Sequence, residues 1–297
     1  MAASLQALGP LRLPFLILTP ACILPAWENA LFQTGAADVL HLVLILLGAL
    51  TAHISVNTFN EYFDYRSGLD LHTTRTPFSG GSGTLPARPA LAGFTLGVAV
   101  VSLGLTLAIG VYFLRVVGPG ILPIGLIGVL IVLSYTPWIT RHPLICLLAP
   151  GVAFGPLMTV GTHLVLTGSY DLSALLLSLP IFFFVNNLLL LNQLPDVEPD
   201  RRAGRRTFPI VYGLPTTRRV YALFMLLGYG SLIAAVMSRH LPAGALLGLA
   251  TLVLALPTLL GVLRYSDDLH RLRPCLGLNV GIAILTPTLI AIGMHLR

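Results

Sequence analysis

Two clusters of acidic and amide side chains interrupt an otherwise apolar chain. Each contains one asparagine and two aspartates: Asn60, Asp64 and Asp70 in the first cluster, and Asn192, Asp196 and Asp200 in the second. In both, the asparagine precedes the first aspartate by four residues, and the cluster follows a long apolar run. Carboxylates at the edge of a membrane span are costly to keep there, so paired clusters indicate a site for something cationic. The pattern predicts a divalent metal site.

The spacing within each cluster suits the ligand chemistry of Mg²⁺. If each apolar helix continues through its cluster, residues four apart lie on one face, and an amide and a carboxylate point at the same spot. Mg²⁺ takes hard oxygen ligands, commonly one or two protein carboxylates with substrate phosphates and water completing the shell. Two clusters facing each other across a cavity would hold two or more ions around one diphosphate.

Arginines near both clusters add donors for phosphate oxygens, because a guanidinium group matches such oxygens in pairs. The candidates are Arg66, Arg75, Arg205 and Arg206. Residues 76–85 form a glycine-rich loop whose backbone amides could approach an anion or close over a pocket. The sequence therefore predicts a diphosphate site beside the metal site.

Each feature also has an interpretation that involves no functional site. Either cluster alone is as consistent with solvated loop charges as with a site, whereas the matched pair with adjacent arginines favours a site. Tyr135 and Arg141 either anchor the membrane interface or contact a substrate. His53 and His163 lie in apolar spans and fit hydrogen-bonded core or cavity residues better than metal ligands.

The composition identifies a polytopic membrane protein. Of 297 residues, 56% are hydrophobic and 9% are charged, against roughly 25% charged in an ordinary soluble domain. Apolar stretches of about 20 residues are long enough to cross a bilayer. Nine are expected, at residues 12–32, 38–60, 90–113, 118–139, 144–167, 172–194, 216–238, 242–264 and 274–295. We expect an all-α bundle of nine transmembrane helices around a central cavity, forming one domain over residues 1–297.

The distribution of arginine predicts the orientation of this bundle. All seventeen basic residues are Arg, and fourteen fall on one side of the expected topology, leaving Arg115, Arg239 and Arg297 on the other. By the positive-inside bias, the amino terminus and both acidic clusters face the cytoplasm, as in a multi-pass protein of the inner cell membrane. The net charge of +6 is accounted for by topology and an anionic ligand, and gives no reason to invoke nucleic acid.

The two clusters resemble the sequence motifs of the UbiA superfamily of intramembrane prenyltransferases. Residues 60–70 are similar to the first motif of its 1,4-dihydroxy-2-naphthoate (menaquinone) branch, residues 192–208 to the second motif, and residues 154–161 to the fifth helix of that branch. Two departures stand out: Arg205 occupies a position where many members have Lys, and the segment after Arg141 lacks a Gly-Leu-Gly-Glu sequence common among relatives.

The resemblance implies a cavity open to the cytoplasmic side and to lipid, in which Mg²⁺ and a prenyl diphosphate bind. The implied metal ligands are Asn60, Asp64, Asp70, Asp196 and Asp200. The four aspartates are the expected catalytic residues. Taking the residue-based candidates together, the expected diphosphate contacts are Asn60, Arg66, Arg75, Asn192, Arg205, Arg206, Tyr135 and Arg141.

The expected reaction is Mg²⁺-dependent transfer of an isoprenoid chain to an aromatic quinone precursor within the lipid bilayer. Metal and arginine would neutralise the diphosphate, and an electron-rich ring would capture the resulting allylic cation. A terpene cyclase of the same superfamily needs the same metal site and is the nearest alternative. A cation-coupled transporter is the alternative from another class, although transporters favour charges near the bilayer midplane.

Overall fold

The computed structural model describes residues 8–73, 75–76 and 79–296, so Arg297 and part of the glycine-rich loop lie outside the described residues. The described chain is helical, with no strand. Apolar segments in a bilayer must pair their backbone groups internally, which a helix does within one segment. The long helices are α2 (Leu18–Thr34), α3 (Val39–Arg66), α6 (Ala92–Val117), α7 (Leu122–Ser134), α8 (Pro143–Val152), α9 (Met158–Thr167), α10 (Leu172–Asn192), α12 (Phe208–Met237), α13 (Leu252–Tyr265) and α14 (Leu269–His295).

Shorter elements cap or join these helices. They are η1 (Gly9–Leu11), η2 (Leu13–Ile17), α4 (Leu69–His72), α5 (Thr84–Ala87), η3 (Pro89–Leu91), η4 (Pro119–Ile121), η5 (Ile139–Arg141), η6 (Ala153–Leu157), α11 (Val197–Arg202) and η7 (Ala243–Thr251). Two of them, α4 and α11, carry parts of the two acidic clusters.

Eight helical stretches in the described chain are long and apolar enough to cross a membrane. They are Gly9–Thr34, Val39–Arg66, Pro89–Val117, Pro143–Thr167, Leu172–Asn192, Phe208–Met237, Ala243–Tyr265 and Leu269–His295. The stretch expected at 118–139 is a shorter apolar helix, Pro119–Ser134, only about 24 Å long at 1.5 Å per residue. Pro137 follows closely and disfavours helix in the residue before it. The chain is a multi-pass membrane protein, but a ninth full crossing is not confirmed.

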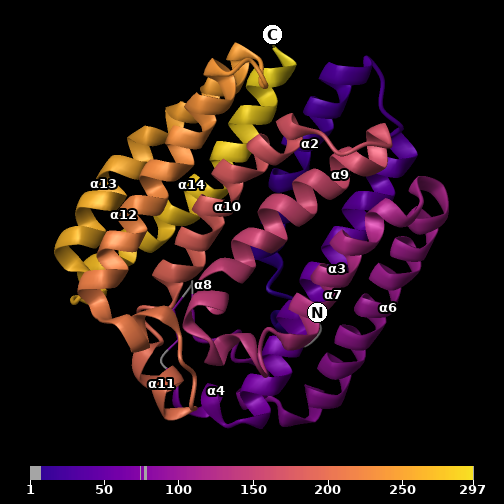
Figure 1. Cartoon of the computed structure of the whole chain (residues 1–297). Coiled ribbons are helices and arrows are strands. Elements are labelled where there is room, and N and C mark those ends of the chain that lie inside the picture. The colour runs from indigo at the N-terminus through magenta and orange to yellow at the C-terminus, as the bar shows by residue number, and fades with distance from the viewer. Residues whose placement is uncertain (1–7, 74, 77–78, 297) are drawn as a thin grey trace.

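The bundle brings the two acidic clusters to one end. In Figure 1 the early helices α3, α6 and α7 lie on one side, α12, α13 and α14 lie on the other, and α10 runs between them. The short helices α4 and α11 pack together at the end opposite the carboxyl terminus (Figure 1). Segments about 130 residues apart in the sequence therefore meet.

A buried polar network fixes the helix that leads into the second cluster. The Asn187 side chain of α10 donates to the Tyr221 carbonyl at 3.0 Å, and the Tyr221 hydroxyl donates to Asn279 Oδ1 at 2.8 Å. Asn279 of α14 in turn donates to the Asn187 carbonyl at 3.0 Å. Polar groups in an apolar interior are costly unless paired, so this closed set holds α10, α12 and α14 in one relative position.

A π-helical turn, η6, separates α8 from α9 and shapes the interior wall. Pro156 lies inside this turn and has no backbone N–H to donate. Gly155 packs so closely on α10 that an added Cβ would lie 2.9 Å from the Ser178 carbonyl oxygen. Turns of this kind often occur at functional sites, and here the turn places Ala153 and Phe154 on the wall of the cavity described next.

Candidate active site

The first cluster projects from a continuous helix, as its spacing predicts. Helix α3 extends to Arg66, so Asn60 and Asp64 share one face, one turn apart. Gly68 follows with φ of 80°, a left-handed conformation that glycine adopts at little cost. The chain turns at Gly68 into the short helix α4, and Asp70 on α4 lines the same cavity as Asn60 and Asp64.

The second cluster is not helical throughout, so that expectation is wrong. Helix α10 ends at Asn192, and the chain turns before α11 begins at Val197. Pro195 accounts for the break, because proline disfavours helix in the preceding residue and cannot donate a helical hydrogen bond. Asn192, Asp196 and Asp200 nevertheless all line the cavity.

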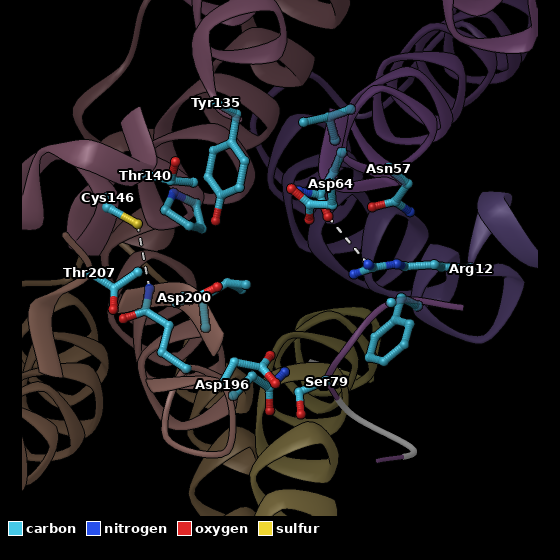
Figure 2. A pocket seen from close by; sticks show the side chains of 18 of the residues that line it. Arg12, Asn57, Asp64, Ser79, Tyr135, Thr140, Cys146, Asp196, Asp200 and Thr207 are labelled. Atoms are coloured by element: carbon cyan, nitrogen blue, oxygen red, sulfur yellow. Dashed lines mark hydrogen bonds between the residues drawn. The ribbon is translucent and has the colours of Figure 1, made fainter. Parts of the chain in front are cut away.

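The cavity has a volume of about 220 Å³ and joins both clusters. Figure 2 shows Asp64 and Arg12 on one wall, Tyr135 and Cys146 on the facing wall, and Asp196 beside Ser79 at the edge. The Tyr135 hydroxyl points into the opening (Figure 2). Away from the charged rim the lining is mainly apolar, and includes Phe15, Leu18, Val56, Ile131, Phe154, Leu188 and Leu189. The site can therefore take a ligand with one anionic and one apolar end.

Arg205 joins the two clusters. Its Nη1 donates to Asp200 Oδ1 at 2.9 Å, and its Nη2 donates to Asp64 Oδ1. Both carboxylates are buried, with 6% and 3% of the residue exposed for Asp64 and Asp200. Burial by itself lowers the pKa of Arg205, but the two carboxylates outweigh burial and raise it. Arg205 therefore stays charged and supplies the positive charge between the clusters.

Among the described residues no arginine forms an ion pair with Asp70 or Asp196, and the pKa values of both carboxyls are raised. Burial, with the neighbouring charges of Asp64 and Glu61, raises the pKa of Asp70 to about 7. Burial and the charge of Asp200 raise the pKa of Asp196 to about 7, although hydrogen bonds from Gly80 and Ser79 oppose this. Both groups lie in an environment that disfavours negative charge until a cation arrives.

Oxygen atoms without partners make the site a fit for a hard cation. Within the described chain, Asp70 Oδ2, Asn192 Oδ1 and Asp196 Oδ1 are buried and accept no hydrogen bond. No three acidic, histidine or cysteine side chains among the described residues converge as a preformed cage. Separate carboxylate and amide oxygens suit Mg²⁺, which usually keeps water and substrate phosphates in its shell.

Sequence reasoning missed an ion pair between Arg12, which lines the cavity, and Glu61 behind it. Glu61 is fully buried and accepts from Arg12 Nε at 2.9 Å, from the Ser82 amide at 2.7 Å and from the Ser82 hydroxyl at 2.7 Å. Arg12 Nη2 also donates to Asn60 Oδ1 at 3.2 Å. The Gly80 amide, from the same loop as Ser82, donates to Asp196 Oδ2 at 3.2 Å. Glu61 therefore holds the glycine-rich loop where it reaches both clusters.

Eight of the predicted residues line the cavity: Asn60, Asp64, Asp70, Asn192, Asp196, Asp200, Arg205 and Tyr135. Four predicted arginines do not line it, and all four are exposed: Arg66, Arg75, Arg141 and Arg206. Arg75 lies against the backbone of Gly83, and the backbone amide of Arg206 donates to the Thr140 carbonyl at 2.9 Å. The predicted diphosphate contacts of these four arginines remain predictions.

Comparison with known proteins identifies the family. The UbiA prenyltransferase family model matches residues 19–278, which includes both acidic clusters. The chain belongs to the UbiA prenyltransferase family. It is 30% identical over 179 residues to 1,4-dihydroxy-2-naphthoate octaprenyltransferase of Bacillus subtilis, an alignment covering 59% of this chain and 56% of that protein. It is 27% identical over 229 residues to UbiA prenyltransferase domain-containing protein 1 of Xenopus tropicalis, covering 74% and 63% respectively. The chain thus aligns with little more than half the length of these relatives.

Solved structures share the fold of this UbiA family member. A structure from a study of digeranylgeranylglyceryl phosphate synthase in membranes superposes with a TM-score of 0.70 at 15% identity, covering all of both chains. A UbiA homolog from Archaeoglobus fulgidus bound to DMAPP and Mg²⁺ superposes with a TM-score of 0.58 at 16% identity, covering 97% of this chain and 99% of that one. The all-helical membrane fold is confirmed.

Proposed function

We propose that this chain transfers an isoprenoid group from a prenyl diphosphate to an aromatic acceptor within the membrane, in a reaction that requires Mg²⁺. The acceptor we propose is a quinone precursor resembling 1,4-dihydroxy-2-naphthoate, as in menaquinone biosynthesis. One observation carries the proposal: two clusters of oxygen donors from distant segments meet at the rim of a cavity whose deeper wall is apolar. The family match, the Bacillus relative and the Archaeoglobus homolog bound to DMAPP and Mg²⁺ support it.

The residues proposed to hold Mg²⁺ are Asn60, Asp64, Asp70, Asp196 and Asp200. The bound ion would neutralise the diphosphate and so make it a better leaving group. Arg205 is placed to add its guanidinium to the same oxygens once a cation has taken over Asp64 and Asp200, because arginine suits phosphate as well as carboxylate. These carboxylates act as ligands, so none needs to serve as a general acid.

Bond breaking leaves positive charge on the isoprenoid and negative charge on the diphosphate. Fixed positive groups such as Arg205 stabilise the leaving anion in the transition state. The ring of Tyr135 faces the cavity and can stabilise the allylic cation through its π electrons. Apolar side chains on the deeper wall, such as Phe154 and Leu188, exclude water and accommodate the isoprenoid tail. A ring carbon of the aromatic acceptor then captures the cation, and the new carbon–carbon bond replaces the carbon–oxygen bond to diphosphate. The ring regains its aromaticity by releasing from that carbon either a proton or, where a carboxyl group stood there, CO₂.

We propose that residues 1–297 act as one transmembrane domain. The arginine distribution supports an inner-membrane location with the amino terminus and both clusters on the cytoplasmic side. The diphosphate end of the substrate would then face the cytoplasm, while its isoprenoid tail lies among apolar side chains. Nothing in the charge pattern requires a nucleic-acid partner.

The test is an assay of the purified protein in detergent with a labelled prenyl diphosphate, Mg²⁺ and a panel of aromatic acids, followed by mass spectrometry of the lipid extract. We expect a prenylated aromatic that requires Mg²⁺ and falls by roughly 100-fold or more in Asp64→Asn and Asp196→Asn. Glu198→Gln is the matched control, because Glu198 lies between Asp196 and Asp200 but is exposed and paired with Arg201.

Other products would point to the alternatives. A cyclic hydrocarbon formed without any acceptor would replace the transferase with a terpene cyclase. If the diphosphate is never consumed while a cation crosses vesicles containing the protein, the transporter alternative would hold.

A further inference from the structure

A polar stripe descends helix α3 from the charged rim into the apolar part of the cavity. Asp64, Asn60, Asn57 and His53 are spaced four, three and four residues apart, so they share one face of the helix. All four line the cavity. The proposed metal and diphosphate chemistry uses the first two. Asn57 and His53 lie deeper, where polar side chains are costly and usually functional.

The His53 ring is held in one orientation. Its Nδ1 shares a hydrogen bond of 2.9 Å with the buried Thr19 hydroxyl of α2. Its ring also meets Phe154 edge to face, with centroids 5.0 Å apart. With Nδ1 engaged, Nε2 is the remaining polar atom of the ring, and it has no hydrogen-bond partner within the described part of the chain. A histidine fixed through one nitrogen presents the other to a ligand.

Asn57 is oriented in a similar way. Its Nδ2 donates to the Leu11 carbonyl at 3.2 Å, and its Oδ1 accepts no hydrogen bond from any described residue. Figure 2 shows Asn57 beside the cavity near Arg12. Asn57 and His53 are one helical turn apart, a rise of about 6 Å. This is comparable to the distance between two hydroxyl groups on opposite sides of one aromatic ring.

We infer that His53 and Asn57 form the subsite that recognises the hydroxyl groups of the aromatic acceptor. This inference rests on the proposed function, which supplies the acceptor. His53 Nε2 makes one hydrogen bond to a ring hydroxyl, Asn57 Oδ1 accepts from another, and Phe154 packs against the ring. An isoprenoid tail has no polar atoms for these groups, so the stripe has a use only if a hydroxylated ring binds there.

The test compares acceptors with and without hydroxyl groups in wild type and in His53→Leu. Acceptor binding is measured by quenching of intrinsic fluorescence for a dihydroxylated naphthoate and for the same ring with its hydroxyls removed. Transfer is measured as kcat/KM for the hydroxylated ring alone, because a ring without hydroxyls is too electron-poor to capture the cation. We expect wild type to prefer the hydroxylated ring by on the order of 10- to 100-fold in binding, the effect of leaving buried polar partners unpaired. His53→Leu should lose most of that preference.

Two further variants separate recognition from a structural effect. His53→Gln keeps a hydrogen-bonding side chain and should retain part of the preference, whereas Thr19→Val frees the ring and should reduce it. His163→Gln is the matched control, because His163 is a buried histidine that does not line the cavity. The KM for the prenyl diphosphate and the Mg²⁺ requirement should stay unchanged in His53→Gln.

Two results would overturn the inference, and they are distinguishable. If wild type prenylates the hydroxylated ring and both His53→Leu and His53→Gln keep the full preference for it, the hydroxyl subsite lies elsewhere, while the proposed function stands. If wild type consumes the diphosphate without prenylating any aromatic acceptor, the proposed function fails and the subsite fails with it.

Discussion

Replacing Arg205 with Met should destabilise the metal-free protein and yet strengthen its binding of Mg²⁺ alone. Arg205 is bound by carboxylates from two segments, Asp64 of α3 and Asp200 of α11. Methionine is unbranched and apolar, so the substitution removes the charge while filling part of the space. Asp64 and Asp200 are both buried, and both then lose the guanidinium group that balances their charge.

The size of the effect follows from the geometry. A single pair at the 2.9 Å of Arg205 and Asp200 corresponds to about 6 kcal/mol of Coulomb energy at an effective dielectric constant of 20, most of it offset by desolvation. Removing one partner of a buried pair typically costs about 3–5 kcal/mol. Protonation of the abandoned carboxylates relieves part of this cost, so we expect about 3 kcal/mol near neutral pH.

Mg²⁺ should offset part of this destabilisation. In the wild type the guanidinium competes for Asp64 Oδ1 and Asp200 Oδ1, the oxygens that a metal would use. The variant should therefore bind Mg²⁺ alone more tightly, by roughly tenfold or more if even 1.4 kcal/mol of that competition is released. Binding of a non-hydrolysable prenyl diphosphate with Mg²⁺ should instead weaken, because a phosphate partner is lost.

Thermal unfolding followed by intrinsic fluorescence, with and without Mg²⁺, measures the first effect, and isothermal titration calorimetry measures the second. Arg206→Met is the matched control, since the neighbouring Arg206 is exposed and does not line the cavity. Arg205→Lys keeps the positive charge but loses the paired N–H donors of the guanidinium group. Its unfolding temperature and its Mg²⁺ affinity should lie between those of the wild type and of Arg205→Met. An unchanged unfolding temperature, or weaker binding of Mg²⁺ alone by Arg205→Met, would refute the reasoning.

Three further outcomes are expected. Mg²⁺ affinity in the absence of diphosphate should rise between pH 6 and pH 8. The pKa values of Asp70 and Asp196 are raised to about 7, so protons compete with the metal below that pH. Equal affinities at the two pH values, measured by calorimetry, would contradict this. Gly244→Ala should lower the unfolding temperature, because the added Cβ would lie 1.9 Å from the Gly293 carbonyl oxygen and the forced shift costs about 1–3 kcal/mol. Glu61→Gln should speed amide exchange in the glycine-rich loop, as a neutral side chain holds Arg12 and the loop less firmly, and unchanged exchange would count against that role.

Helical periodicity explains which of the residues predicted for the site lie at the cavity and which lie away from it. Asn60 and Asp64 share a face because α3 continues through them, which the four-residue spacing anticipates. Arg66 is a predicted diphosphate contact because it is close to Asp64 in the sequence. A separation of two residues on a helix, however, places the two side chains about 200° apart around the helix axis. The same rule that placed Asp64 at the cavity therefore puts Arg66 away from it, where it is exposed.

Other parts of the site depend on contacts that no local pattern encodes. Arg12 reaches Glu61 from the junction between η1 and η2, where Arg12 itself adopts a left-handed φ of 52°. Left-handed conformations are unfavourable for residues other than glycine, and no turn signal marks this one in the sequence. The contact joins residues 49 apart, and the Glu61 contact with Ser82 joins residues 21 apart. The sequence shows that Arg12 is the charged residue before the first span, but it does not predict that Glu61 is its partner.

The two clusters have similar sequences but differ in local structure, because one begins inside a helix and the other at the end of a helix. The first cluster begins inside α3, where Asn60 and Asp64 are fixed by a continuous helix that packs along α6. The second begins where α10 ends, and Asp196 lies in a turn, where it accepts hydrogen bonds from the Gly80 amide and the Ser79 side chain. We therefore expect any rearrangement on ligand binding in the segment after Asn192 and not in α3, because moving α3 would break its packing while moving a turn breaks a few hydrogen bonds.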